Sequence, residues 1–139
     1  RCSRDWSSDV CSSDLLPPRE RELVILRIGW LCEAEYEWAQ HVRIGLQCGL
    51  TLDEVHRIKL GHSAAGWSAR DVLLLQAVDE LHKDAFITDT TWQGLAAHFD
   101  TRQLVDLVFA IGQYNLVSMV LNTLGVQLDA DLEHTFANT

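Results

Sequence analysis

The sequence predicts an all-α protein with one folded domain of about six helices. Three observations support this prediction. Apolar residues recur mostly at the three- and four-residue spacing of amphipathic helices. Proline occurs only twice in 139 residues, so little interrupts the helical pattern. Hydrophobic residues make up 47% of the chain, which is enough for a core and argues against extensive disorder.

The first two helices are expected on either side of a turn within residues 29–33. Pro17 and Pro18 precede a helical run over residues 19–31. Proline suits a first helical turn because its missing N–H would be unpaired there. The second helix is expected over residues 33–48, and Gly49 follows it as a natural stop.

The other four helices are predicted from their start and stop signals. Thr51 and Glu54 have the spacing of a capping box, and Ser68 is a typical N-cap. Gly125 marks the end of the last helix. In chain order, the expected helices are 51–59, 68–84, 89 or 90 to 99, and 100 or 101 to 122.

The last of these helices is apolar enough to raise the question of a membrane. Asp106, Gln113 and Asn115 interrupt its apolar run, and no basic flank follows. We therefore expect a buried core or interface helix, and no membrane as a partner. Gly112 in its middle predicts the close approach of a neighbouring backbone, because glycine otherwise weakens a helix.

Both ends of the chain differ from this pattern. Residues 1–15 contain a near-repeat of Ser-Ser-Asp, hold two of the four cysteines and have almost no apolar periodicity. We interpret them as translated sequencing-adapter read-through, with a short disordered natural tail as the alternative. The domain is expected over residues 16–128, followed by an acidic tail over residues 129–139.

Charge and cysteine content limit the partners and the compartment. A formal net charge of −9 disfavours nucleic acid and anionic membrane surfaces, because both repel an acidic chain. Beyond residue 15 the chain has two cysteines, Cys32 and Cys48, sixteen positions apart. Two unclustered cysteines are typical of a reduced, cytoplasmic protein and not of a disulfide scaffold.

The second helix carries the candidate site. At helical spacing, Ala34, Glu37, His41 and Ile44 fall on one stripe that is otherwise apolar. Glu37 and His41 are therefore expected to face inward, one turn apart and within hydrogen-bonding reach. A shielded carboxylate–imidazole pair can hold an acid or base near neutral pH. The alternative is a structural pair that fixes helix packing.

Several segments together resemble a known family. Residues 19–27, 36–41 and 49–55 resemble the carboxymuconolactone decarboxylase family, which includes the alkylhydroperoxidase D proteins. Residues 79–82, 112–117 and 122–126 are similar to the C-terminal half of its members. The resemblance covers nearly all of residues 16–128. It implies an alkylhydroperoxidase D-like helical bundle, a homotrimer or homohexamer, a small-molecule substrate, and neither a metal nor a cofactor.

The resemblance also implies site residues. In the peroxidase branch, a Glu, a Cys-x-x-Cys pair and a His form a proton relay and a redox pair. The matching Glu and His are Glu22 and His41, whereas the cysteine positions hold Ala34 and Glu37. A thiol peroxidase needs a thiolate, so the sequence is closer to the decarboxylase side of the family. On one continuous helix Glu22 would lie roughly 28 Å from His41, so the chain must turn back between them.

The expected chemistry is acid–base catalysis on a small lactone, keto acid or related carbonyl compound. His41 is the expected acid/base, Glu37 orients it and raises its basicity, and Glu22 is a second acid/base or a substrate anchor. The side chains expected to line the pocket are Tyr36, Trp38 and Tyr114.

Three alternatives remain open from the sequence. One is a peroxiredoxin-type antioxidant protein, and another is a non-catalytic oligomeric binding protein. The third is a metal site of Glu33, Glu37 and His41, although Glu33 is more simply explained as an acid at a helix start. Arg27 is either a cation that receives an acidic substrate or a solvent-exposed residue.

Overall fold

A computed structural model of the chain describes residues 15–129, and all regular structure within that range is helical. The predictions for residues 1–14 and for residues 130–139 of the tail therefore lie outside the described residues. The all-α prediction is confirmed. The six helices are α1 (Pro18–Leu31), α2 (Glu35–Gln47), α3 (Leu52–Leu60), α4 (Ala69–Asp84), α5 (Asp89–Ala96) and α6 (Thr101–Leu124).

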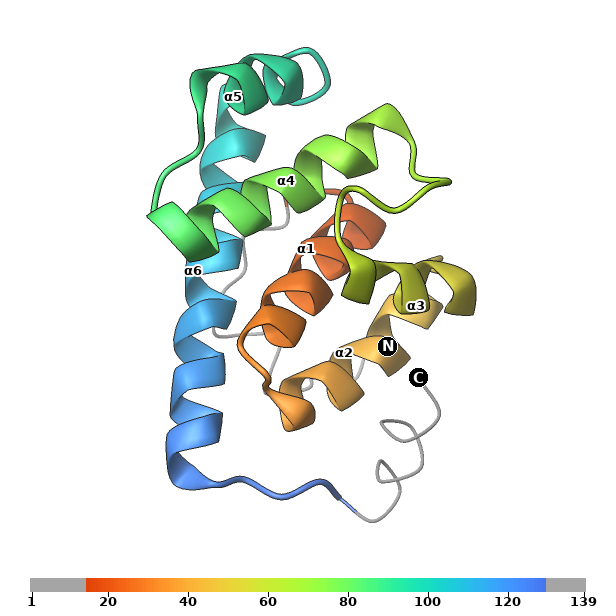
Figure 1. Ribbon diagram of the computed structural model, residues 1–139, viewed down its shortest axis with the longest axis vertical. Helices are drawn as coiled ribbons and strands as arrows, with labels where there is room; N and C mark the ends of the chain where they lie inside the picture. Colours follow the sequence, from red (N-terminus) through yellow and green to blue (C-terminus); the bar gives the residue numbers. More distant parts are fainter. Residues whose placement is uncertain (1–14, 130–139) are drawn as a thin grey trace.

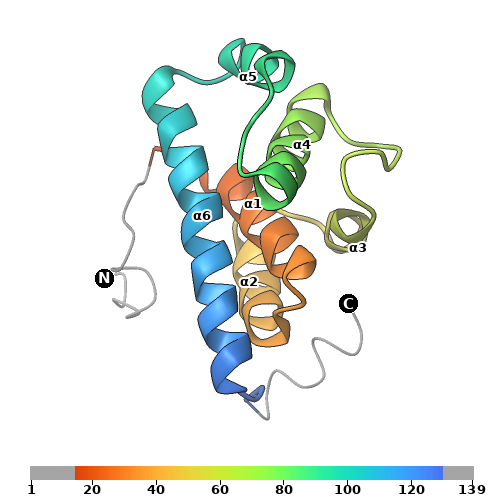
Figure 2. The ribbon, with the colours of Figure 1, turned by 60° about the vertical axis from the view of Figure 1, so that its left-hand side comes forward.

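Helix α1 lies at the centre of the molecule. Figure 1 shows α2, α3, α4 and α6 arranged around it, with α5 at the far end of α4. In Figure 2, α6 runs the full height of the molecule beside α1 and α2. Residues 23–26 of α1, Leu-Val-Ile-Leu, are completely buried, so this helix is apolar on all sides in its middle. The core is built on α1, and its neighbours cover it.

Three helices begin with the caps that the sequence predicts. The Thr51 hydroxyl accepts from the Glu54 N–H while the Glu54 carboxylate accepts from the Thr51 N–H, which completes a capping box. At the start of α4, the Ser68 hydroxyl accepts from the Asp71 N–H. Asp100 and Gln103 form a second capping box at the start of α6. These local signals depend only on neighbouring residues, which is why the sequence alone locates them.

The expected bounds of α5 and α6 are corrected. Helix α5 is capped by the Thr88 hydroxyl and ends at Ala96, so residues 97–99 are not part of it. Helix α6 continues to Leu124, two residues beyond the prediction, and Gly125 ends it in the left-handed conformation. The prediction for Gly112 is wrong within this chain, because a Cβ there would meet no atom within 4 Å.

One side of α6 is apolar and exposed. We call Val105, Phe109, Gly112, Leu116, Met119, Val120 and Leu124 the apolar face of α6. The exposed fractions of its six larger residues range from 46% to 72%. By length and composition α6 could also cross a membrane, but core helices of soluble proteins pass the same test. The expected core helix is thus buried on one side only.

The α1–α2 turn lies at residues 32–34, and α2 begins two residues later than predicted. Glu33 has a left-handed backbone (φ 52°), with its N–H bonded to the Trp30 carbonyl. The N–H of Ala34 bonds to the carbonyl of Gly29, so the turn is a Schellman motif with Glu33 at the position that glycine prefers. Glu33 is therefore not an acid within the helix.

Replacing Glu33 with Gly is expected to stabilise the protein by about 0.5–1 kcal/mol, because glycine adopts a left-handed backbone without a Cβ penalty. Urea unfolding at pH 7 measures the effect. Glu35→Gly is the matched control, since it puts glycine inside the first turn of α2 and should destabilise by up to about 1 kcal/mol. If Glu33→Gly is less stable than wild type, the Glu33 side chain makes a contact that outweighs the cost of its left-handed backbone.

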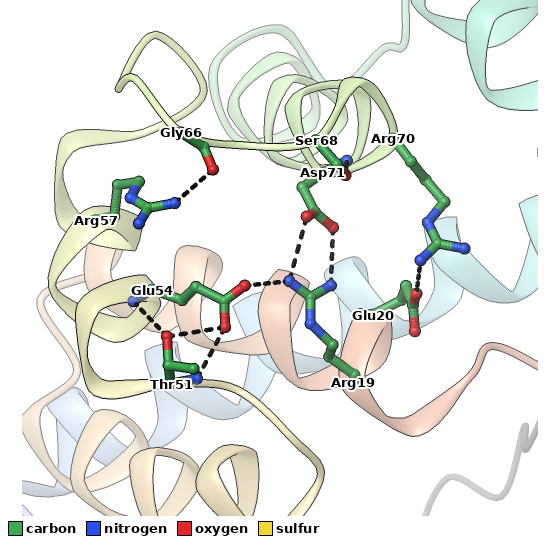
Figure 3. A network of polar contacts seen from close by, with 9 residues as sticks. All are labelled: Arg19, Glu20, Thr51, Glu54, Arg57, Gly66, Ser68, Arg70 and Asp71. Atoms are coloured by element: carbon green, nitrogen blue, oxygen red, sulfur yellow. Dashed lines mark hydrogen bonds and ion pairs between the residues drawn. The ribbon is translucent and has the colours of Figure 1, made fainter.

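A polar network joins α1 to α3 and α4, as Figure 3 shows. The Arg19 guanidinium donates to both oxygens of Asp71, at 2.9 and 3.2 Å, and also to Glu54. Beside it, the buried Glu20 pairs with Arg70. Arg19 thus connects the start of three helices through one side chain.

Replacing Arg19 with Met is expected to destabilise the protein at pH 7 by about 2–4 kcal/mol, because it leaves the buried Asp71 carboxylate without its cation. Burial raises the pKa of Asp71, but hydrogen bonds from Arg19 and Ser68 outweigh it and lower the pKa below 3.8. A lowered pKa stabilises the fold above pH 3.8, and this contribution disappears as the pH falls through the folded-state value.

Urea unfolding at pH 7 and pH 3 separates the charge effect from simple packing. The difference between wild type and Arg19→Met should shrink from pH 7 to pH 3, because protonation of Asp71 removes the charge that Arg19 pairs with. Arg102→Met, at an exposed position, is the control. If the free energies of unfolding of wild type and Arg19→Met differ equally at both pH values, Arg19 stabilises the fold through its aliphatic part and not through its charge.

Candidate functional site

Glu22, His41 and Glu37 form a buried cluster between α1 and α2. His41 Nδ1 lies 2.6 Å from Glu22 Oε2, and His41 Nε2 lies 3.0 Å from Glu37 Oε1. The three residues are 3%, 8% and 5% exposed, respectively. The structure therefore brings together the three residues that the sequence and its family resemblance indicated, with one carboxylate on each side of the imidazole.

Helix packing explains how Glu22 reaches His41. The chain reverses at residues 32–34, so α2 returns along α1. Gly45, one turn after His41, faces α1, where a Cβ would be 3.3 Å from Leu26 Cδ1 and 3.7 Å from Glu22 Cβ. It would also be 2.9 Å from Cδ1 of Leu50, which follows α2, so a larger residue here would have to displace neighbouring side chains beside the site. The sequence analysis missed this residue, although an isolated glycine inside a helix is a signal of close packing.

The two carboxylates are not equivalent. Glu22 makes a directed hydrogen bond with His41 Nδ1. Glu37 Oε1 is close to Nε2, but the geometry is not aligned, and this buried oxygen has no hydrogen-bond partner. The sequence analysis gave the orienting role to Glu37, whereas in the structure the aligned contact comes from Glu22. Glu37 thus presents a buried acceptor with unused capacity.

The pKa of His41 is strongly perturbed. Burial alone would lower it, but Glu22 and Glu37 together outweigh burial and raise it to about 9. Both ring nitrogens face carboxylates, so the doubly protonated imidazolium is the form that the site favours. At neutral pH His41 is therefore a proton donor in its resting state.

The expected pocket residues lie around the cluster in three different ways. Tyr114 of α6 contacts the His41 ring edge-on, with ring centroids 4.9 Å apart. Trp38 is 1% exposed and contributes to a cavity of 480 Å³, together with Gly29 and Ala34. Tyr36 lines a separate cavity of 250 Å³ beside the end of α6.

The 480 Å³ cavity borders the cluster without containing it. Among the described residues that line it, none is Glu22, His41 or Glu37. However, Gly29 lies between the cavity and Glu37, since a Cβ on Gly29 would be 3.5 Å from Glu37 Cγ. Trp30 completes the aromatic wall, with its ring 5.2 Å from that of Trp38.

Two residues that the sequence analysis considered for the site are elsewhere. Arg27 is 8% exposed and donates to Asp79 and to the carbonyls of Ile58 and Lys59, so it is neither solvent-exposed nor available to a substrate. Glu33 is exposed in the α1–α2 turn. Within residues 15–129, no three His, Cys, Asp or Glu side chains gather as a metal site, which removes the Glu33–Glu37–His41 alternative.

The fold and the site together define an all-α protein with a buried carboxylate–imidazole cluster. The family model described as "carboxymuconolactone decarboxylase family" matches residues 7–80, more than half of the chain. The chain therefore belongs to the carboxymuconolactone decarboxylase family. The match begins inside the segment that we interpret as adapter-derived. The comparison with curated proteins found no match.

Two solved structures share the fold. One is a protein of unknown function from Agrobacterium tumefaciens, named as a candidate antioxidant defence protein AhpD, with 23% identity and a TM-score of 0.78. The alignment covers 86% of this chain and 82% of that one. The other is an uncharacterised peroxidase-related protein from Silicibacter sp. TM1040, with 18% identity and a TM-score of 0.76, covering 90% and 66% of the two chains. At these identities the likeness establishes the fold alone.

Proposed function

We propose that the protein is an enzyme that uses Glu22, His41 and Glu37 for acid–base chemistry on a small lactone, keto acid or related carbonyl compound. The observation that carries this proposal is an imidazole held between two buried carboxylates. Ala34 and Glu37 occupy the positions of the family's Cys-x-x-Cys pair, and neither side chain can act as a thiol. This disfavours the peroxidase alternative.

We infer a role for each residue from its contacts. Glu22 fixes the orientation of His41 through the 2.6 Å hydrogen bond. The Nε2–H of His41 is not tied to an aligned acceptor, so it can turn to a substrate oxygen. Glu37, whose Oε1 lies 3.0 Å from His41 Nε2 without an aligned hydrogen bond, is the base that takes a proton from substrate or water.

Decarboxylation at this site proceeds through an enolate. The bond between the carboxylate carbon and its neighbour breaks, CO₂ leaves, and the electron pair moves into the adjacent carbonyl to form an enolate. His41 donates a hydrogen bond to the developing oxyanion, where a preorganised donor is most effective. The enolate carbon then takes a proton from the His41 imidazolium, and His41 recovers its proton from solvent.

A substrate screen tests the function. Wild type and His41→Gln are assayed with small lactones and keto acids, following CO₂ release and ultraviolet absorbance. His41→Gln should lose activity by about 100-fold or more. His62→Gln is the matched control, because His62 also pairs with a carboxylate, Asp79 at 2.7 Å, on other elements. Equal turnover in wild type and His41→Gln would exclude His41 from the mechanism.

A hydroperoxide assay tests the peroxidase alternative. Hydroperoxide reduction that depends on Cys32 or Cys48 would overturn the proposed acid–base function, because it would place the chemistry on a thiol. Specific ligand binding without turnover of any substrate would favour the non-catalytic alternative.

We also infer that the protein self-associates through the apolar face of α6, with a second copy as the partner. The face carries no charge over several turns, and Gly112 leaves open space for a helix backbone. Exposed patches of this kind are uncommon on monomers. The same proposal includes a trimer or hexamer, as the family resemblance implies, and a reducing cytoplasm, as the two unclustered cysteines indicate.

A further inference from the structure

A second group of chemically active side chains surrounds Cys32, the C-cap residue directly after α1. Cys32 Sγ lies 3.9 Å from Nδ1 of His82 on α4, and the thiol donates to Oδ1 of Asn115 on α6 at 3.0 Å. Cys32 is half-buried, and His82 is exposed. Three helices therefore converge on one sulfur that the Glu22–His41–Glu37 cluster does not use.

The cluster is held in place from α6. The Asn122 side chain donates to the Cys32 carbonyl at 2.7 Å, which fixes the end of α1. Ser118 is completely buried, and its hydroxyl has no hydrogen bond of regular geometry. Burial raises the pKa of the Cys32 thiol, and the adjacent Ser118 hydroxyl lowers it in part. An unsatisfied buried hydroxyl beside a thiol is a polar group available to a ligand.

A cavity of 230 Å³ adjoins these residues. His82 and Asn115 line it, and the remaining walls are mainly apolar, including Ile28, Val108 and Ile111. His82 and Asn115, which contact the Cys32 sulfur, thus also border a space that could hold a small guest beside the cluster. The apolar walls would shield a bound ion on one side, while exposed His82 provides access from solvent.

The donor set decides which ligand fits. Ions that need four protein ligands have too few here, since no three His, Cys, Asp or Glu residues of the described chain gather as a site. Thiolate and imidazole are the donors that suit Cu⁺. With bonds of roughly 2.3 Å to sulfur and 2.0 Å to nitrogen, the two donors lie about 3.7 Å apart at a 120° angle and about 4.3 Å apart in a linear arrangement. The observed 3.9 Å falls within this range.

We propose that Cys32 and His82 bind a soft monovalent ion of the Cu⁺ class, with Asn115 and Ser118 as supporting polar groups. On binding, the Cys32 S–H bond breaks, its proton leaves to solvent, and a sulfur–metal bond forms with no electron transferred. Nδ1 of His82 donates its lone pair, with the ring proton on Nε2. This site is independent of the proposed acid–base function.

The test uses the full chain with Cys2 and Cys11 replaced by Ser, so that two thiols remain. Cu⁺ is supplied under anaerobic conditions from a bicinchoninate buffer, and the competitor absorbance gives stoichiometry and affinity. We expect one Cu⁺ per chain. Cys32→Ser should abolish this binding, and His82→Gln should weaken it by at least about tenfold. Cys48→Ser is the matched control, because Cys48 is also half-buried and free, and it should bind as the parent does.

Several outcomes would overturn the proposal. They are equal losses in Cys32→Ser and Cys48→Ser, unchanged affinity in His82→Gln, and no binding by the parent. Circular dichroism checks folding, and exposed His82 provides a variant that preserves the fold if Cys32→Ser does not. In the parent, the ¹⁵N signals of His82 should shift on Cu⁺ addition, whereas an effect confined to other histidines would place the ion elsewhere.

Discussion

The pKa of His41 is expected to fall clearly below its value of about 9 when Glu22 is replaced with Gln. The reason is that burial acts against the imidazolium, and two carboxylates are needed to overcome it. Removing the carboxylate with the directed 2.6 Å hydrogen bond takes away the larger part of that compensation. A pH titration of the histidine ring signals by NMR measures the change, with His62 as the internal reference.

The same pair of proteins should differ in the pH dependence of stability. The pKa of His41 in the folded state, about 9, lies above the ordinary value of 6.5. The folded protein therefore binds this proton more tightly than the unfolded chain does. The resulting stabilisation, about 3 kcal/mol, is complete below pH 6.5 and disappears as the pH rises through 9.

Urea unfolding between pH 6 and 10 should thus show a steeper decline for wild type than for Glu22→Gln. Glu20→Gln is the control, because Glu20 is equally buried on the same helix but pairs with Arg70 instead. Identical slopes in wild type and Glu22→Gln, or a His41 pKa that does not move, would contradict the electrostatic account of the site.

A single lysine on the apolar face of α6 is expected to dissociate the oligomer. Phe109 is 69% exposed in one chain, and burying such a side chain contributes about 1.5–3 kcal/mol. Phe109→Lys removes this contribution and adds an unpaired charge, so the dissociation constant should rise by at least about 100-fold. Sedimentation velocity over a range of protein concentrations measures it.

Phe86 offers the matched control, since it is 58% exposed and lies between α4 and α5, away from the apolar face of α6. Phe86→Lys should sediment like wild type. A monomeric wild type, or an unchanged association state in Phe109→Lys, would contradict self-association through α6. Circular dichroism on both variants establishes that a change in sedimentation reflects association and not unfolding.

Local sequence signals predicted much of the fold. The caps at Thr51, Ser68 and Asp100 were found because a cap depends on residues three positions apart. The end of α1 was less accessible, because nothing in the sequence indicates that a glutamate at residue 33 adopts a left-handed backbone. Tertiary packing also decided the environment of Gly112, which faces open space and not a neighbouring helix of the same chain.

The candidate site was predictable in part. Helical periodicity placed Glu37 and His41 on one inward stripe, and the structure buries both. Periodicity said nothing about Glu22, which lies nineteen positions from His41 and came only from the family resemblance. Arg27 was misjudged because its partners, including Asp79, lie on α3 and α4, and contacts between distant elements leave no local pattern.

The central position of α1 has a consequence for biosynthesis. Residues 23–26 leave the ribosome well before α6, the helix that covers one of their sides and is completed about a hundred residues later. Until then this segment, which is completely buried in the finished protein, stays uncovered on that side in the nascent polypeptide. Hydrogen exchange during arrested translation should accordingly find α1 unprotected, whereas α1 should be well protected once α6 has packed against it.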